Sequence, residues 1–227
     1  IMGEFAECLE GIKEACEFLN YPVVSGNVSF YNGTNKKNIS PTPVIGGVGL
    51  INKLLKPLGH NFKKDKSIIL LIGKTFGHLE QSCFLKENYS IIDGMPPEVN
   101  LVNEKNNGDN VLRLIQENLV LSAHDVSNGG LIVALSEMCM SSGYGIKIQK
   151  PKKLANLIKY FFGEDQGRYI LEIHPNNLDK VEKKLKSNKI YYENIGLTQK
   201  DFIEIEDEFK TNIKDLFKIN NEWYNRY

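Results

Sequence analysis

The sequence predicts an α+β protein on three observations. A helical rhythm of apolar residues opens the chain, short apolar runs of strand length recur from about residue 67, and helical stretches separate those runs. With 227 residues, the chain can bury a real core as one large domain or as one domain plus part of another. We therefore expect helices and strands to pack together.

The first element expected is an amphipathic helix that ends near Pro22. Its apolar residues recur at i, i+3, i+4 and i+7, and they are Phe5, Cys8, Leu9, Ile12, Cys16 and Leu19. An extended segment over residues 23–31 follows and is broken at Gly26, and Asn32-Gly33 is a tight-turn signal before a second β-like run over residues 41–50. The opening unit is thus expected to be helix, strand, turn, strand.

Residues 57–66 are expected to link two structural units. Pro57 and Gly59 interrupt regular structure there, and the stretch is rich in lysine. Its basic character is more typical of a solvated loop than of a binding site. The predicted units are residues 1–56 and residues 67–227.

The second unit is expected to alternate strands and helices. Strands are predicted at residues 67–72, 119–122, 145–148, 168–173, 191–197 and 202–205. Helices are predicted at residues 97–118 with an interruption at 106–108, after Gly129-Gly130, at residues 151–161 and 178–187, and from residue 213 to the end. The last helix carries an aromatic face that we expect to dock on the sheet.

Composition narrows the classes of partner. Lys and Arg total 28, and Asp and Glu also total 28, so the formal net charge is zero. We therefore expect no overall electrostatic attraction to nucleic acid or to an anionic membrane. The four cysteines include no Cys-x-x-Cys pair and are expected to be reduced. With no apolar run of membrane-spanning length, we expect a soluble, cytoplasmic protein. The helical pattern starts without a cap after Ile1, which suggests a fragment.

The first candidate site lies in residues 23–32. Gly26 removes a side chain where a phosphate or nucleotide could approach the backbone. Asn27 can offer a neutral oxygen to Mg²⁺, and the Ser29 hydroxyl, on the same face of a strand, can bind phosphate. The alternative is a β-bulge with solvent-facing polar residues.

The second candidate site is at His124 and Asp125. They follow a predicted strand and precede a helix start, where amides collect anions and a carboxylate can bind metal. Asp125 is the better metal candidate. The alternative is capping by Asp125 or Ser127, with His124 as a hydrogen-bonded core residue.

A polar turn over residues 162–168 is the third candidate. It could bind substrate or a regulatory nucleotide, but a turn whose acids pair with Arg168 is the simpler interpretation.

Four segments in this order resemble the phosphoribosylformylglycinamidine synthase family of the aminoimidazole ribonucleotide synthase-like superfamily. The first is Pro-Val-Val-Ser-Gly-Asn-Val-Ser with Tyr-Asn following, at residues 22–32, and the second is Pro-Thr-Pro-Val-Ile-Gly, at residues 41–46. The third is Ser-Ala-His-Asp-Val-Ser, at residues 122–127, and the fourth is Phe-Gly-Glu with Gln-Gly-Arg, at residues 162–168. The resemblance implies the end of a second ATP-binding amino-side domain over residues 1–56. A linker over residues 57–66 and a complete carboxy-side mixed α/β sandwich domain over residues 67–227 would follow.

The resemblance also implies an activity. The family is an ATP-dependent carbon-nitrogen ligase of purine biosynthesis that converts formylglycinamide ribonucleotide and glutamine-derived ammonia to the amidine through a phosphorylated amide. It implies ATP and Mg²⁺ as cofactors, with Gly26 touching ATP, Asn27 binding the metal and Ser29 holding substrate. Asp125 would belong to an auxiliary nucleotide site or be purely structural.

The same resemblance implies partners and alternatives. Partners would be the amino-terminal part of the enzyme and a glutaminase subunit. The family's full chain resembles two fused copies of an aminoimidazole ribonucleotide synthase-like unit, and a chain lacking the first copy's catalytic His and acidic metal ligands should not turn over alone. One alternative is a non-catalytic nucleotide-binding or scaffold module. Another is a related ATP-dependent enzyme such as aminoimidazole ribonucleotide synthase, selenophosphate synthetase or thiamine phosphate kinase. The continuations Tyr31-Asn32 and Pro41-Thr42-Pro43 argue against that second alternative.

Overall fold

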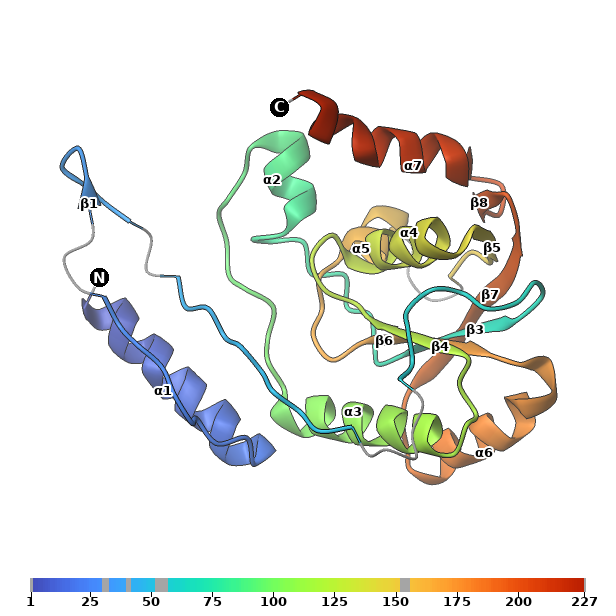
Figure 1. Cartoon of the computed structure of the whole chain (residues 1–227), viewed down its shortest axis with the longest axis horizontal. Coiled ribbons are helices and arrows are strands. Elements are labelled where there is room, and N and C mark those ends of the chain that lie inside the picture. Colours follow the sequence, from blue (N-terminus) through green and yellow to red (C-terminus); the bar gives the residue numbers. More distant parts are fainter. Residues whose placement is uncertain (1, 30–32, 40–41, 52–56, 152–155, 227) are drawn as a thin grey trace. The chain divides into compact units, whose positions relative to one another are not determined.

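Two compact units make up the fold, residues 1–54 and residues 55–227. The computed structural model describes residues 2–29, 33–39, 42–51, 57–151 and 156–226 (Figure 1). Within those ranges, no helix is both long and apolar enough to cross a membrane.

The first unit consists of a helix, a small hairpin and extended chain. Helix α1 spans Met2–Leu19, and strand β1, Gly33–Thr34, pairs antiparallel with β2, Lys37–Asn38. None of the unit's described residues is buried. Strands need a partner and an apolar face to bury, which explains why residues 21–29 and 42–51 form none.

The second unit is built on a seven-stranded sheet of order β4-β6-β3-β7-β5-β8-β9. All neighbours are antiparallel except β5 and β8. The strands are β3 (Ile68–Ile72), β4 (Ser122–Asp125), β5 (Tyr144–Ile148), β6 (Tyr169–Ile173), β7 (Tyr192–Lys200), β8 (Phe202–Ile205) and β9 (Phe209–Asn212).

Helices cover both faces of this sheet (Figure 1). The helices are α2 (Cys83–Tyr89), α3 (Leu101–Gln116), α4 (Gly130–Ser142), α5 (Leu157–Phe162), α6 (Leu178–Ser187) and α7 (Ile213–Glu222), with short 3₁₀ turns at Pro175–Asn177 and Trp223–Arg226. Helices α3 and α6 pack on one face, and α4, α5 and α7 pack on the other.

The central strand β3 shows why its sequence is apolar throughout. Ile69 and Leu71 join the core under α4 and α5, whereas Leu70 and its alternate neighbours join the core under α3 and α6. A strand whose side chains alternate between two covered faces has no solvent face left for polar residues. The predicted α+β class, a sheet with helices packed on it, is confirmed.

Several elements differ from their predicted form. The hairpin turn lies at Asn35 and Lys36, which both have positive φ, and the expected turn at Asn32 lies outside the described residues. Strand β4 starts at Ser122, later than predicted. Helix α5 starts at Leu157, and residues 152–155 of the predicted helix lie outside the described ranges. Helix α2 and strand β9 were not predicted at all.

Helix α3 runs without a break through residues 106–108, contrary to the predicted interruption. The Asn107 side chain donates to the carbonyl of Gly167 at 2.9 Å, and Gly108 lies against the hydroxyl of Tyr169. Tertiary contacts therefore outweigh the poor helix propensity of this stretch.

The predicted linker region is tied to the second unit. Phe62 is buried in the core, and the backbone amides of Lys63 and Lys64 donate to the carboxylate of Glu172 at 2.8 and 3.1 Å. Glu172 is fully buried on β6 and also accepts a hydrogen bond from the Ser122 hydroxyl at 2.8 Å. These contacts hold the segment that leads into β3.

Candidate functional site

The sequence-predicted residues Gly26, Asn27 and Ser29 lie together in the first unit. They follow α1 in a stretch without regular structure, and all three are exposed. Tyr21 fixes the start of this stretch, because its hydroxyl accepts from the amide of Val48 at 2.7 Å. Residues 21–29 form no strand and hence no β-bulge, but their polar side chains face solvent, as the alternative interpretation expected.

Gly26 leaves open space beside the backbone. Apart from its two chain neighbours, no heavy atom of the described residues lies within 4 Å of the position that a Cβ would occupy there. An external group can therefore approach this backbone closely. Asn27 and Ser29 add an amide oxygen and a hydroxyl, which can contact a metal ion or a phosphate.

Asp125 lies in the second unit and lines a pocket of about 490 Å³. Five other carboxyl or amide residues contribute to the lining, which is Gln81, Pro96, Pro97, Glu104, Asp125, Val126, Ser127, Asn128, Glu164, Gln166, Gly167, Arg168 and Tyr169. Its volume lies within the range of small-molecule sites, roughly 300–1,000 Å³.

Asp125 ends β4 and faces solvent. Its carboxylate lies 3.2 Å from Nδ1 of His124, and the other ring nitrogen of His124 lies 3.2 Å from the carboxylate of Glu137. His124 is thus a largely buried histidine between two carboxylates. The His60 ring packs on it edge to face, with the centroids 5.2 Å apart.

Helix capping by Asp125 or Ser127 is wrong, whereas His124 is hydrogen-bonded as that alternative expected. Gly129 is the residue that precedes α4, and no side chain of its own segment caps the helix. Its backbone amide instead donates to Oε1 of Glu164 at 2.8 Å. An internal carboxylate therefore occupies the position where the sequence suggested that an external anion could bind.

The polar turn at residues 162–168 forms the framework behind the pocket. Asp165 is buried and accepts from the backbone amides of Phe76, Gly77 and His78 at 2.9 to 3.1 Å. Arg168, also buried, lies 3.9 Å from the Asp165 carboxylate. The predicted pairing of an acid with Arg168 is confirmed.

The side chain of Arg168 donates its hydrogen bonds to groups within the protein. Its side chain bonds the carbonyls of Asp165 and Gly163 and the hydroxyl of Thr75. Burial lowers the pKa of this guanidinium, and the nearby Asp165 opposes that shift. Arg168 therefore positions backbone and is not presented to a ligand.

Tyr169 and Glu104 complete one wall of the pocket. The Tyr169 hydroxyl donates to the Glu104 carboxylate at 3.3 Å. Burial, with a smaller contribution from Glu104, raises the pKa of Tyr169 to about 12. The phenol is thus a neutral hydrogen-bond donor at physiological pH.

Sequence reasoning missed several pocket residues. Gln81, Pro96 and Pro97 flank the unpredicted α2, and Glu104 sits on α3, far along the chain from Asp125. No local pattern marks them, because only the antiparallel pairing of β4 with β6 and the packing of α3 bring them together. Among the described residues, no group of three or more His, Cys, Asp or Glu side chains could hold a metal ion.

Family models match most of the chain. The model described as AIR synthase related protein, C-terminal domain, matches residues 66–206, and that of the N-terminal domain matches residues 2–51.

Curated relatives match the whole chain. Phosphoribosylformylglycinamidine synthase subunit PurL of Pelagibacter ubique is 47% identical over 226 residues, and that of Bradyrhizobium diazoefficiens is 43% identical over 228 residues. Each alignment covers 100% of this chain and 31% of the relative. The chain therefore spans about a third of the length of these relatives.

Solved structures share the fold. T. maritima PurL complexed with ATP gives a TM-score of 0.56 at 12% identity, covering 70% of this chain and 27% of that chain. The same protein complexed with FGAR gives a TM-score of 0.57 at 14% identity, covering 70% of this chain and 29% of that chain. At such identities the likeness concerns the fold alone.

Proposed function

Since this chain belongs to the AIR synthase related proteins, we propose that it forms part of a phosphoribosylformylglycinamidine synthase. The observation that carries the proposal is the identity of 47% and 43% to two subunits of that name across the whole chain. The chain spans 31% of each relative, so the activity is proposed for the longer protein, to which this chain contributes residues.

The proposed reaction is the ATP-dependent amination of formylglycinamide ribonucleotide in purine biosynthesis. ATP transfers a phosphoryl group to the formamide oxygen, and glutamine-derived ammonia then displaces phosphate to give the amidine. Such a reaction depends on positioning the reactants and on stabilising charge at the phosphoryl oxygens. The partners proposed are the remaining part of the enzyme and a glutaminase subunit that supplies ammonia.

Three residues of the first unit are proposed as contacts to this reaction. Gly26 would lie against ATP, because the open space beside it admits a close approach to the backbone. Ser29 would hold the substrate through its exposed hydroxyl. Asn27 would bind Mg²⁺ through its side-chain oxygen.

Asn27 fits Mg²⁺ only as one neutral ligand. Mg²⁺ prefers six oxygens, often from carboxylates and nucleotide phosphates, and among the described residues no group of three or more acidic, His or Cys side chains could hold a metal ion. The charged ligands would therefore come from ATP and from the rest of the protein. When bound, the ion would screen the charge of the phosphate oxygens. On this basis the chain by itself is expected to be inactive.

Replacing Asn27 tests the assignment in the full-length protein. Asn27→Ala is expected to lose ATP- and Mg²⁺-dependent amidine formation while its circular dichroism spectrum stays the same. Asn38→Ala is the matched control, because Asn38 is an exposed asparagine of the same unit outside the motif. Unchanged activity in Asn27→Ala would overturn the assignment.

Asp125 is proposed as part of an auxiliary nucleotide site, because it lines the pocket of about 490 Å³. Calorimetry of this chain with ATP and Mg²⁺ tests the idea directly. Binding that disappears in Asp125→Ala supports the auxiliary site. Binding that survives this change, or no binding at all, assigns Asp125 a purely structural role.

A further inference from the structure

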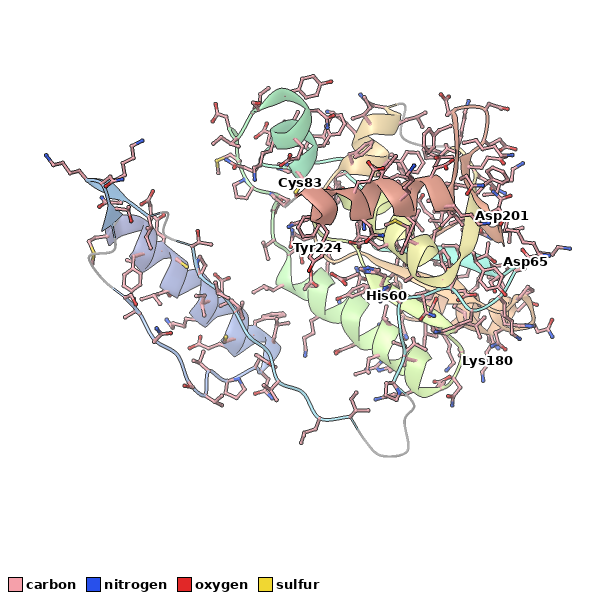
Figure 2. All side chains as sticks on the ribbon, turned by 45° about the horizontal axis from the view of Figure 1, so that its top comes forward. His60, Asp65, Cys83, Lys180, Asp201 and Tyr224 are labelled. Atoms are coloured by element: carbon pink, nitrogen blue, oxygen red, sulfur yellow. The ribbon has the colours of Figure 1, made fainter. Side chains whose placement is uncertain are left out.

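One oxygen of Glu164 accepts two backbone hydrogen bonds from distant parts of the chain. The amide of Cys83 donates to Oε1 at 2.8 Å, and the amide of Gly129 donates to the same atom at 2.8 Å. Cys83, labelled in Figure 2, is the first residue of α2, and Gly129 is the residue before α4. A single carboxylate therefore joins the starts of two helices.

The turn that carries Glu164 is held firmly in place. The amide of Glu164 donates to the carbonyl of His78 at 2.9 Å. The next residue, Asp165, is buried and accepts from three successive backbone amides. The carboxylate of Glu164 thus projects from a fixed frame, and the two helix starts are attached to that frame.

The residue before helix α4, the buried Gly129, has its amide bonded by Glu164. The helix has no side-chain cap from its own segment, and a carboxylate near a helix start stabilises it by a hydrogen bond and by favourable interaction with the helix dipole. Helix α2 has its own cap, since Ser82 Oγ accepts from the Leu85 amide at 3.3 Å. The bond from Cys83 to Glu164 therefore satisfies a second amide at the start of α2 and also attaches this helix to the turn that carries Glu164.

Both attached segments form walls of the pocket. Gln81 lies just before α2, and Ser127 and Asn128 lie just before Gly129. Glu164 lines the same pocket between them. The spacing of the two walls consequently depends on the two bonds to one oxygen atom.

We propose that Glu164 is a positioning residue that couples the start of α2 to the turn before α4, so that these two walls of the pocket open together and not independently. The coupling follows from the shared acceptor, because movement of Glu164 breaks both bonds at once. It does not depend on the proposed reaction or on which ligand the pocket takes.

Amide hydrogen exchange of the ¹⁵N-labelled full chain tests the coupling. In Glu164→Ala, exchange at Cys83 and at Gly129 is expected to accelerate together, by at least about tenfold, which is the scale of one lost hydrogen bond to a charged group. Amides of the central strand β3 are expected to keep their protection. Equal acceleration of β3 would indicate general destabilisation and would overturn the proposal.

Two further variants sharpen the test. Glu164→Gln keeps an acceptor oxygen, so it is expected to restore protection at both amides by similar factors. Glu87→Gln removes an exposed carboxylate from the same helix α2 and is expected to change neither amide. If Glu164→Ala fails to fold, unequal loss of protection at the two amides in Glu164→Gln overturns the coupling, and equal loss supports it. Acceleration of one amide without the other, or of neither in Glu164→Ala, contradicts the coupling.

Discussion

Single buried carboxylates hold this fold together by accepting backbone amides. Asp165 accepts three of them, and Glu172 accepts two together with a hydroxyl. An ionised oxygen accepts stronger hydrogen bonds than a neutral one, and each donor left without a partner in the interior is costly. Both acids lie on or beside β6, which makes this strand the anchor for two loops.

Glu172 is expected to contribute strongly to stability. In Glu172→Ala, the amides of Lys63 and Lys64 and the hydroxyl of Ser122 lose their acceptor in the interior. We expect the free energy of unfolding to fall by about 3 kcal/mol or more, measured by urea denaturation. Glu208→Ala, which removes a surface carboxylate paired with Lys150, is expected to change it little. A loss no larger than that of this control would contradict the role assigned to Glu172.

Glu164 is also expected to control the thiol of Cys83. Burial raises the pKa of this thiol above its usual 9.0, the charge of Glu164 adds to the rise, and Lys86 opposes it. Removing the negative charge in Glu164→Gln favours the thiolate, so the pKa of Cys83 falls. Thiol reactivity should then set in at lower pH, measured in a background where Cys8 and Cys16 are replaced by serine. An unchanged or higher onset pH would be inconsistent with this placement of Glu164.

At the scale of elements, local pattern located most helices and strands of the second unit. Helix α6 covers the predicted residues, and β8 does as well, because apolar periodicity there matches the face that each element buries. Helix α2 and strand β9 were not predicted, because both are short and largely exposed and their sequences therefore show little apolar periodicity. The continuity of α3 came from contacts with residue Gly167, which no local pattern encodes.

The junction before α4 admits no side chain at Gly130. Its φ is +72°, and a Cβ there would lie 2.7 Å from the Gly163 carbonyl oxygen. Gly130→Ala is expected to destabilise the chain by about 3 kcal/mol, since backbone strain of roughly 1–3 kcal/mol is joined by a clash with fixed backbone. Thermal unfolding measures the change.

Gly143→Ala is the matched control for this prediction. Gly143 ends the same helix with a similar φ of +76°, but no heavy atom lies within 4 Å of a Cβ there. Only the conformational cost of about 1 kcal/mol is expected. Equal losses of stability in Gly130→Ala and Gly143→Ala would contradict the prediction, because they would show that movement of the backbone at residues 161–163 relieves the clash.

At the scale of the molecule, the two units differ in what they bury. Every buried hydrophobic residue within the described ranges lies at Phe62 or later. In the first unit, the apolar stripe of helix α1 is only half-buried, and Leu9 within it is exposed. Since none of its described residues is fully buried, the first unit contributes little stability of its own.

Residues 57–227 are therefore expected to fold when produced alone. The urea concentration at the midpoint of unfolding should match that of the whole chain within error, because this segment contains both core clusters. Tryptophan fluorescence of Trp223 and far-UV circular dichroism should report one coincident transition. A midpoint well below that of the whole chain would mean that the first unit stabilises the second.

The sequence alone determined the α+β class, most elements of the second unit, the family resemblance and the candidates Gly26, Asn27, Ser29 and Asp125. These depend on local periodicity and on short motifs, which are readable along the chain. Only the tertiary structure decided that Asp125 shares a pocket with Glu104 and Glu164, and that Glu164 joins α2 to α4. The physical reason is that strand pairing and the hydrogen bonds of buried carboxylates join residues far apart in sequence, and no local pattern records such partners.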